Sequence, residues 1–107
     1  MATYTNTSYV AKNVGTSPVT LTTVSSGTAA IASLVMCNTT TSPITTSVYI
    51  TRSATNYYLV YQATVPVGGS LECIQGNRVV LNTSDALVVV NSAATSGDAV
   101  ASVLLAV

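Results

Sequence analysis

The sequence predicts an all-β protein, and three features of its composition and spacing support this. Of its 107 residues, 18 are Thr and 17 are Val, and such β-branched side chains pack well on a pleated sheet. Strong helix formers other than Ala and Leu are scarce, with one Lys, one Glu, two Met and two Gln. Gly, Pro, Asn and Ser recur at short, regular intervals, as expected for many short strands joined by turns.

The segments between these turns are the expected strands. Side chains alternate between two faces in 30–37, where Leu34 and Met36 share one face and Val35 and Cys37 share the other. The strongest turn signal lies at 66–69, where Pro fixes φ and two Gly accept positive φ. Another turn is expected at 75–77. The expected strands are 8–14, 19–24, 30–37, 44–52, 57–65, 71–74, 78–81, 87–91 and 100–106.

Together these segments predict an antiparallel β-sandwich, of the jelly-roll or immunoglobulin-like type, with about eight or nine strands. The length suits one domain. Residues 1–14 are expected to form an N-terminal arm or first strand, and residues 15–107 a single β-sandwich domain.

The chain is almost free of charge. Charged residues make up 6% of it and the formal net charge is zero, against a typical charged share of about 25%. Ser and Thr, 31 residues together, supply most of the polarity. Two interpretations are open: a soluble monomer with a hydroxyl-rich surface, or a subunit largely covered by neighbours, where unpaired charges would be costly to bury. The second is preferred, because a net charge near zero promotes association.

The same composition argues against nucleic acid and membrane partners. The three cations, Lys12, Arg52 and Arg78, are too few and too scattered for a phosphate or anionic-lipid footprint. The first five residues show neither the basic nor the apolar region of a signal peptide, and the apolar run 99–107 is too short to cross a bilayer. We therefore expect synthesis in a cytoplasm, with Cys37 and Cys73 as buried, reduced thiols.

No residue pattern points to catalysis. The chain has no His, which removes the usual general base of Ser and Cys nucleophiles and the commonest metal ligand. Its carboxylates, Glu72, Asp85 and Asp98, fall in three separate segments, and Asp85 suits a turn. We therefore expect that the chain is not an enzyme, and that it has no catalytic residues, no metal-binding residues and no cofactor.

Two expected strands are apolar on both faces, which makes them candidate interfaces. They contain Val88 and Val90, and Val103 and Leu105. A sandwich strand normally has one wet face, so the outer faces here should also be covered. The cover is either the chain's own N-terminal arm or a neighbouring subunit.

The six tyrosines are the only aromatic residues. Tyr57 and Tyr61 stand at even spacing and are expected on one strand face, and Tyr4 and Tyr9 lie in the N-terminal segment. Three roles are open for tyrosines of this kind: core or rim packing, a protein-contact patch, and a platform on which carbohydrate stacks. Tyr4, Tyr9, Tyr57 and Tyr61 therefore join the candidate interface.

The order of segments from residue 21 onward resembles a group of small β-sandwich virion proteins of tailed bacteriophages, comprising decoration, tail and unassigned structural proteins. The likeness covers about four-fifths of the chain and is mainly a rhythm of strands and turns. This chain departs from the group in having Val88 and Val90 where such proteins often carry polar residues. The matching residues are Ser33-Leu34-Val35-Met36-Cys37-Asn38, Tyr57-Tyr58-Leu59-Val60, the run 65–72, Val79-Val80-Leu81 and Asp85-Ala86-Leu87-Val88-Val89.

The resemblance implies a virion structural protein, foremost a capsid decoration (cement) protein that binds the major capsid protein and stabilises the head. It would assemble in the host bacterial cytoplasm, with other virion proteins as partners and a homo-oligomer, such as a trimer at three-fold positions, as its expected state. The alternatives are a tail, neck or baseplate component, or a glycan- or receptor-binding module.

Overall fold

The computed structural model describes residues 4–74 and 79–106 of the 107. The expected turn at 75–77 lies outside these residues, as does Arg78. Within them the chain is all-β, as the sequence predicts. Nine strands follow one another: β1 (Tyr4–Val14), β2 (Val19–Thr23), β3 (Thr28–Asn38), β4 (Ile44–Arg52), β5 (Thr55–Val65), β6 (Ser70–Glu72), β7 (Val79–Leu81), β8 (Ala86–Asn91) and β9 (Gly97–Ala106).

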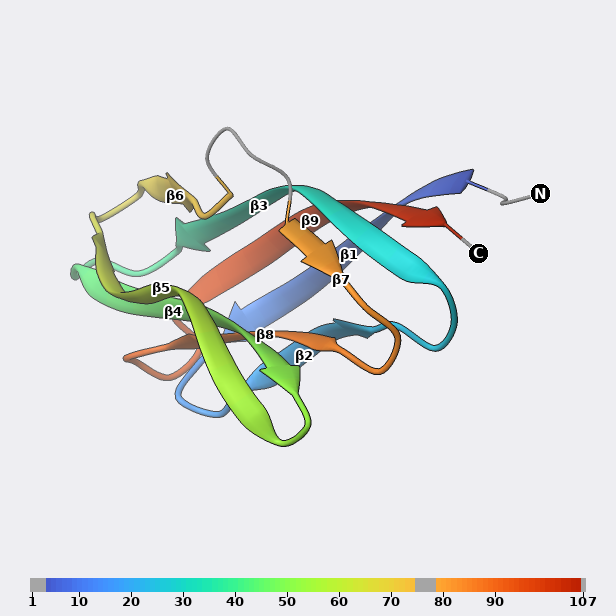
Figure 1. Cartoon of the computed structure of the whole chain (residues 1–107). Coiled ribbons are helices and arrows are strands. Elements are labelled where there is room, and N and C mark those ends of the chain that lie inside the picture. Colours follow the sequence, from blue (N-terminus) through green and yellow to red (C-terminus); the bar gives the residue numbers. More distant parts are fainter. Residues whose placement is uncertain (1–3, 75–78, 107) are drawn as a thin grey trace.

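The strands form two antiparallel sheets that face each other (Figure 1). Sheet 1 has the order β1-β9-β3, with β6 and β7 both paired to the free side of β3. Sheet 2 has the order β2-β8-β4-β5. If β6 and β7 count as one interrupted strand, the first strand pairs with the last, the second with the second last, and so on inward. Strands nested in this way form the eight-stranded jelly roll. Of the two sandwich types that the sequence predicts, the fold is therefore the jelly roll and not the immunoglobulin-like type.

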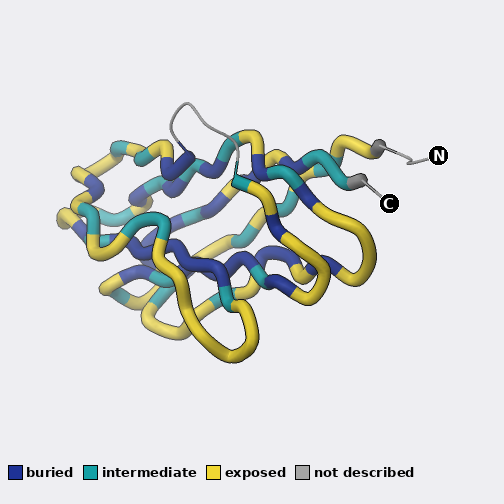
Figure 2. The backbone as a smooth tube through the Cα atoms, in the orientation of Figure 1, coloured by how far each residue is buried: buried dark blue, intermediate teal, exposed yellow. Residues whose placement is uncertain are grey.

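The core lies between the sheets and is made from the inward-facing residues of every long strand (Figure 2). On β9 these residues are Ala99, Ala101 and Val103, which alternate with outward-facing neighbours. Burial of apolar area supplies the main driving force for such a fold. The largest fully buried apolar side chains are Ile31, Leu34, Met36, Leu81, Leu87, Val14, Val48, Val65 and Val89.

One end of the sandwich is fixed by a buried carboxylate. Asp85, 1% exposed, accepts hydrogen bonds from Arg52 Nε at 2.9 Å and from the Asn82 backbone N–H at 2.8 Å. Its own carbonyl accepts the Val24 N–H at 3.0 Å. Arg52 lowers the pKa of Asp85 below its usual value, although burial opposes the shift. The turn before β8 is thereby tied to β4 and to the end of β2.

Two irregularities in the β4–β5 ladder shape the outer surface of sheet 2. Between the pairs Thr46↔Ala63 and Val48↔Val60, β4 has one residue and β5 has two. One of these, Gln62, has φ 50°, and its N–H donates to Ser47 Oγ at 2.9 Å. A second extra residue, Leu59, follows the Val48↔Val60 pair. Each is a β-bulge, which reverses the face on which the following side chains lie.

Candidate interaction surfaces

The outer face of sheet 1 presents a row of valines to solvent. Val10 on β1 pairs with Val100 on β9, and Val100 pairs with Val35 on β3. Val10 is 73% exposed and Val100 47%. The next row consists of serines from the same three strands, Ser8↔Ser102 and Ser33↔Ser102. On the other side of the valine row lie Cys37 and Asp98, which pair with each other, and Lys12, so the valine row runs between a serine row and an ion pair.

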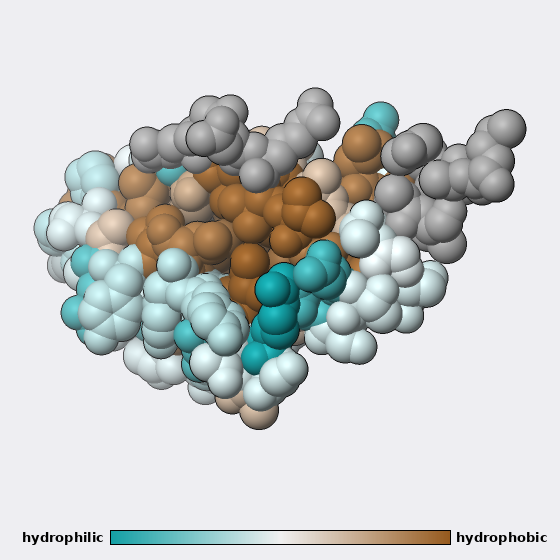
Figure 3. Space-filling view, in the orientation of Figure 1, coloured by the Kyte–Doolittle hydropathy of each residue, from teal (hydrophilic) through white to brown (hydrophobic). Residues whose placement is uncertain are grey.

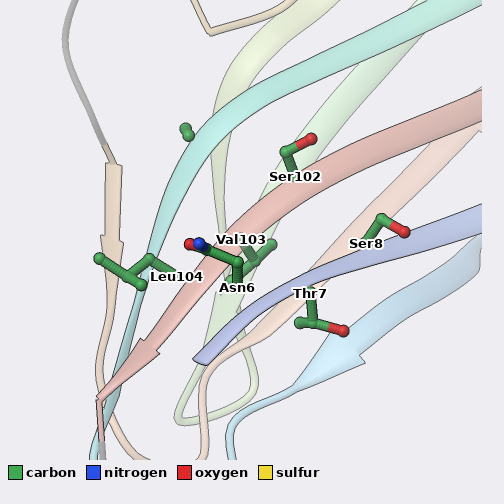
Figure 4. Close-up of a pocket in the computed structure, with 7 residues that line it drawn as sticks. Asn6, Thr7, Ser8, Ser102, Val103 and Leu104 are labelled. Atoms are coloured by element: carbon green, nitrogen blue, oxygen red, sulfur yellow. The ribbon is translucent and has the colours of Figure 1, made fainter. Parts of the chain in front are cut away.

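A broad, open depression of about 620 Å³ lies beside these rows, between β1 and β9 (Figure 4). Asn6, Ser8, Ser102 and Leu104 contribute to its lining. No charged side chain lines it. An ion pair joins Lys12 Nζ to Asp98 Oδ2 at 3.7 Å and lies on the far side of the valine row from the depression. The depression therefore offers a partner an uncharged lining.

Two residues of the predicted interface are buried within the chain itself. Val103 is 2% exposed, because it is one of the inward-facing residues of β9 and belongs to the core cluster. Val88 faces outward but is only 5% exposed. It lies directly opposite Tyr49, which is itself 8% exposed. The prediction is wrong at these two positions: Val103 belongs to the core, and Val88 is buried within the chain, opposite a tyrosine of β4.

The remaining aliphatic candidates and the N-terminal tyrosines lie in three places. Val90 is partly exposed on β8 and lines a hollow on the outer face of sheet 2. Tyr9 and Leu105 are partly buried, pack against the core and share a narrow hollow of about 100 Å³ with the end of β2. Tyr4 pairs through its backbone with Ala106, and its side chain lies outside the described part. The eight predicted positions therefore do not form one continuous patch.

Tyr57 and Tyr61 point to opposite faces of sheet 2, contrary to the even-spacing prediction. Tyr57 pairs with Ile50, a core residue, so it leaves the strand on the inward side. Tyr58 pairs with Tyr49 on the outward side, with ring centroids 5.1 Å apart. The Leu59 bulge then brings Tyr61 onto the Tyr58 side, where the two rings meet edge to face at 4.9 Å. The bulges in β5 cause the difference.

The open side of the sandwich, where β5 faces β7, carries a second apolar surface. Figure 3 shows hydrophobic residues gathered between these strands. Leu59, Val60 and Val79 are partly buried there and pack against the core. These side chains extend the core toward the open side of the sandwich.

The chemically reactive groups lie apart from one another. Asp85 bonds to Arg52, Asp98 pairs with Lys12, and Glu72 Oε1 accepts the Leu34 N–H at 3.2 Å. Within residues 4–74 and 79–106, no group of three or more His, Cys, Asp or Glu side chains is arranged to hold a metal ion. The same residues contain no helix long and apolar enough to span a membrane.

Both cysteines are free thiols. Cys37 lies on the outer face of β3 beside Asp98 and is partly exposed. Cys73 is 8% exposed, and burial raises the pKa of its thiol to about 11. The two groups differ in accessibility, so they differ in expected reactivity.

Sequence reasoning missed the row formed by Val10, Val35 and Val100. On its strand face each valine is flanked by small or polar residues two positions away, such as Ser8 and Lys12 around Val10 on β1. The three form a row only because β1, β9 and β3 pair in one register. That register joins segments from opposite ends of the chain and cannot be deduced from local alternation.

Comparison with solved structures finds the same fold in two assemblies. A chain from the crystal structure of the T13 IBDV viral particle superimposes with a TM-score of 0.62 at 11% identity, covering 99% of this chain and 31% of that chain. A chain of the Bacillus endospore appendages, a family of disulfide-linked pili, superimposes with a TM-score of 0.56 at 15% identity, covering 96% of this chain and 86% of that chain. The likeness is one of fold.

This chain thus spans about a third of the length of the viral-particle chain. No family model matches the sequence. Comparison with curated protein sequences gives no match either.

Proposed function

We propose that this chain is a non-catalytic structural protein of a virion, and specifically a capsid decoration (cement) protein of a tailed bacteriophage. The outer face of sheet 1 carries the proposal. Its valine row, in which Val10 and Val100 are exposed and Val35 is partly exposed, and its uncharged depression suit burial against another protein. The same fold in a viral particle supports the proposal.

The size of the face explains why such a protein would act in many copies. Four strands about 4.8 Å apart and roughly eight residues long, at about 3.3 Å per residue, give a face on the order of 500 Å². A standard interface buries about 800 Å² per partner. One such contact would therefore be weak, whereas many symmetric contacts that bridge neighbouring major-capsid subunits would together stabilise the head. The chain would assemble onto the shell in the bacterial cytoplasm, and a trimer at three-fold positions would triple the contact.

Adding purified chain back to shells that lack it tests the proposal. Val10→Lys with Val100→Lys should lower the bound copies per shell more than tenfold, because burying two lysines without partners is costly. Val67→Lys is the matched control, since Val67 is 51% exposed and belongs to the turn between β5 and β6, not to the valine row. Equal binding by the double variant, or equal loss in the control, contradicts the proposed surface.

Copy number separates this function from its alternative, a tail, neck or baseplate component. Quantitative mass spectrometry of whole particles should find hundreds of copies for a capsid protein and tens or fewer for a tail protein. A count in the tens, with density on the tail in a particle map, would overturn the capsid assignment.

A further inference from the structure

The outer face of sheet 2 carries a hollow of about 260 Å³ that the shell-binding surface does not use. It lies on the opposite side of the sandwich from the valine row, so both surfaces can be occupied together. It is lined by Thr45 and Ser47 of β4, Tyr58, Tyr61 and Gln62 of β5, Val90 and Asn91 of β8, and Ser92, which directly follows β8.

The two bulges of β5 build this hollow. The first leaves Ser47 opposite both Tyr61 and Gln62, which opens the ladder. The second places Tyr58 and Tyr61 on one face, where their rings meet at 86°. Gln62 holds the left-handed φ of 50° that this arrangement requires. A non-glycine residue in that region costs free energy, so the rest of the fold must hold the backbone there.

The polar groups of the hollow are fixed in position and retain donors. Ser47 Oγ accepts the Gln62 N–H at 2.9 Å, and Ser92 Oγ accepts the Thr45 N–H at 2.9 Å. Each hydroxyl proton is left without an acceptor among the described residues, so each can donate to a ligand oxygen. The exposed Gln62 side chain can both donate and accept.

The apolar part of the hollow is an exposed aromatic wall. Tyr61 is 64% exposed and Tyr58 48%, and Tyr58 is supported from behind by buried Tyr49. No charged residue lines the hollow, so an anionic or cationic ligand would find no counter-charge. A ring with apolar C–H faces and hydroxyl edges matches both parts of the lining.

We propose that this hollow binds a neutral carbohydrate, with one sugar ring stacked on Tyr61 and its hydroxyls bonded to Ser47, Gln62 and Ser92. The volume lies just below the range of about 300–1,000 Å³ typical of drug-sized ligands, which suits a single ring at the surface. The binding is reversible and involves no chemical step. It does not depend on the proposed attachment to a capsid.

Saturation-transfer difference NMR on the full chain tests this, with cellobiose, maltose, lactose and N,N′-diacetylchitobiose as probes at millimolar concentration. Transfer from the protein to the C–H protons of at least one disaccharide is expected. Tyr61→Ala should raise the Kd about tenfold or more, which corresponds to the loss of one aromatic stacking contact. Tyr61→Phe should keep most of the signal, because it keeps the ring.

Tyr57→Ala is the matched control, since Tyr57 is 56% exposed on the same strand but points to the other face. Its signal should equal that of the native chain. No transfer to any of the four disaccharides overturns the proposal, as does transfer that survives Tyr61→Ala or is lost equally in Tyr57→Ala. If Tyr61→Ala instead lowers binding to shells, the hollow is a protein contact and the carbohydrate assignment is wrong. Thermal unfolding of each variant confirms that the fold is kept.

Discussion

Replacing Asp85 by Asn should destabilise the protein strongly although the residue lies outside both candidate surfaces. The carboxylate accepts hydrogen bonds from Arg52 Nε, from Arg52 Nη2 and from the Asn82 backbone N–H. The substituted side-chain amide would keep one acceptor oxygen and turn a donor toward the guanidinium, so at least one charge-assisted hydrogen bond is lost. Such bonds contribute about 1.5–3 kcal/mol each.

The expected loss for Asp85→Asn is about 2 kcal/mol at pH 7, at the lower part of this range. The Arg52 side chain is 47% exposed, so water can solvate the guanidinium once the carboxylate is gone. For a chain of this length, a loss of about 2 kcal/mol lowers the Tm by roughly 8 °C. Urea unfolding at 25 °C, followed by far-UV circular dichroism, measures the loss directly.

The pH dependence of that loss gives an independent check. The pKa of Asp85 is lower in the folded chain than in the unfolded one, because Arg52 donates hydrogen bonds to the carboxylate. The unfolded chain then binds more protons at low pH, so the contribution is complete above about pH 4 and is lost as the pH falls through the folded pKa. The difference between native and Asp85→Asn stabilities should therefore shrink below about pH 4.

Asp98→Asn is the matched control, because it removes an ion pair that is exposed at the surface. Lys12 is 80% exposed and its Nζ stands 3.7 Å from Asp98 Oδ2, and exposed pairs contribute about 0–1 kcal/mol. The reasoning is refuted if Asp85→Asn costs no more than Asp98→Asn at pH 7. It is also refuted if the difference between the native chain and Asp85→Asn stays constant well below about pH 4.

Three further predictions concern packing and thiol accessibility. Leu34→Ala, at a fully buried side chain, should lower the free energy of unfolding by about 2–5 kcal/mol in urea titrations, and a loss below about 1 kcal/mol would show that the core refills. Gly97→Ala places a Cβ against the Cys37 carbonyl oxygen, too close for van der Waals contact, and should lower the free energy of unfolding by about 2 kcal/mol or more. Gly68 has φ +67° and open space around it, so Gly68→Ala should lower the free energy of unfolding by only about 1 kcal/mol. Iodoacetamide at pH 8 should alkylate Cys37 before Cys73, whose pKa is about 11 through burial, and equal rates by peptide mass spectrometry would contradict the burial of Cys73.

The elements of this fold could be predicted because they depend on local sequence. The turn at 66–69 contains the residues its geometry requires, and Gly68 has the predicted positive φ. The alternation in β3 placed Leu34 and Met36 together, and both are buried. Strand pairing is different, because it joins distant segments: β1 to β9 across almost the whole chain. Local patterns therefore predict a sandwich, while the jelly-roll nesting depends on contacts that they do not contain.

The candidate surfaces were less predictable, for two physical reasons. The first is the β-bulge. The extra residue Leu59 places Tyr57 and Tyr61 on opposite faces of the sheet, and the residue types at this site do not predict a bulge. The second is coverage within the sheet. Val88 looks like an interface residue in sequence, yet its cross-strand neighbour Tyr49 buries it. Side chains on one strand are covered by the strands beside it, so exposure follows from register.

The low charge of the chain takes on a more specific meaning in this fold. The two outer faces differ in kind: sheet 1 exposes small valines and serines in rows, and sheet 2 exposes a tyrosine pair around a hydroxyl-lined hollow. Neither hollow is lined by a charged residue. A flat valine face can lie against a protein shell, while an aromatic hollow on the reverse side stays open to solvent. If sheet 1 attaches the chain to a particle, sheet 2 is the face turned outward, where a carbohydrate ligand could reach Tyr61.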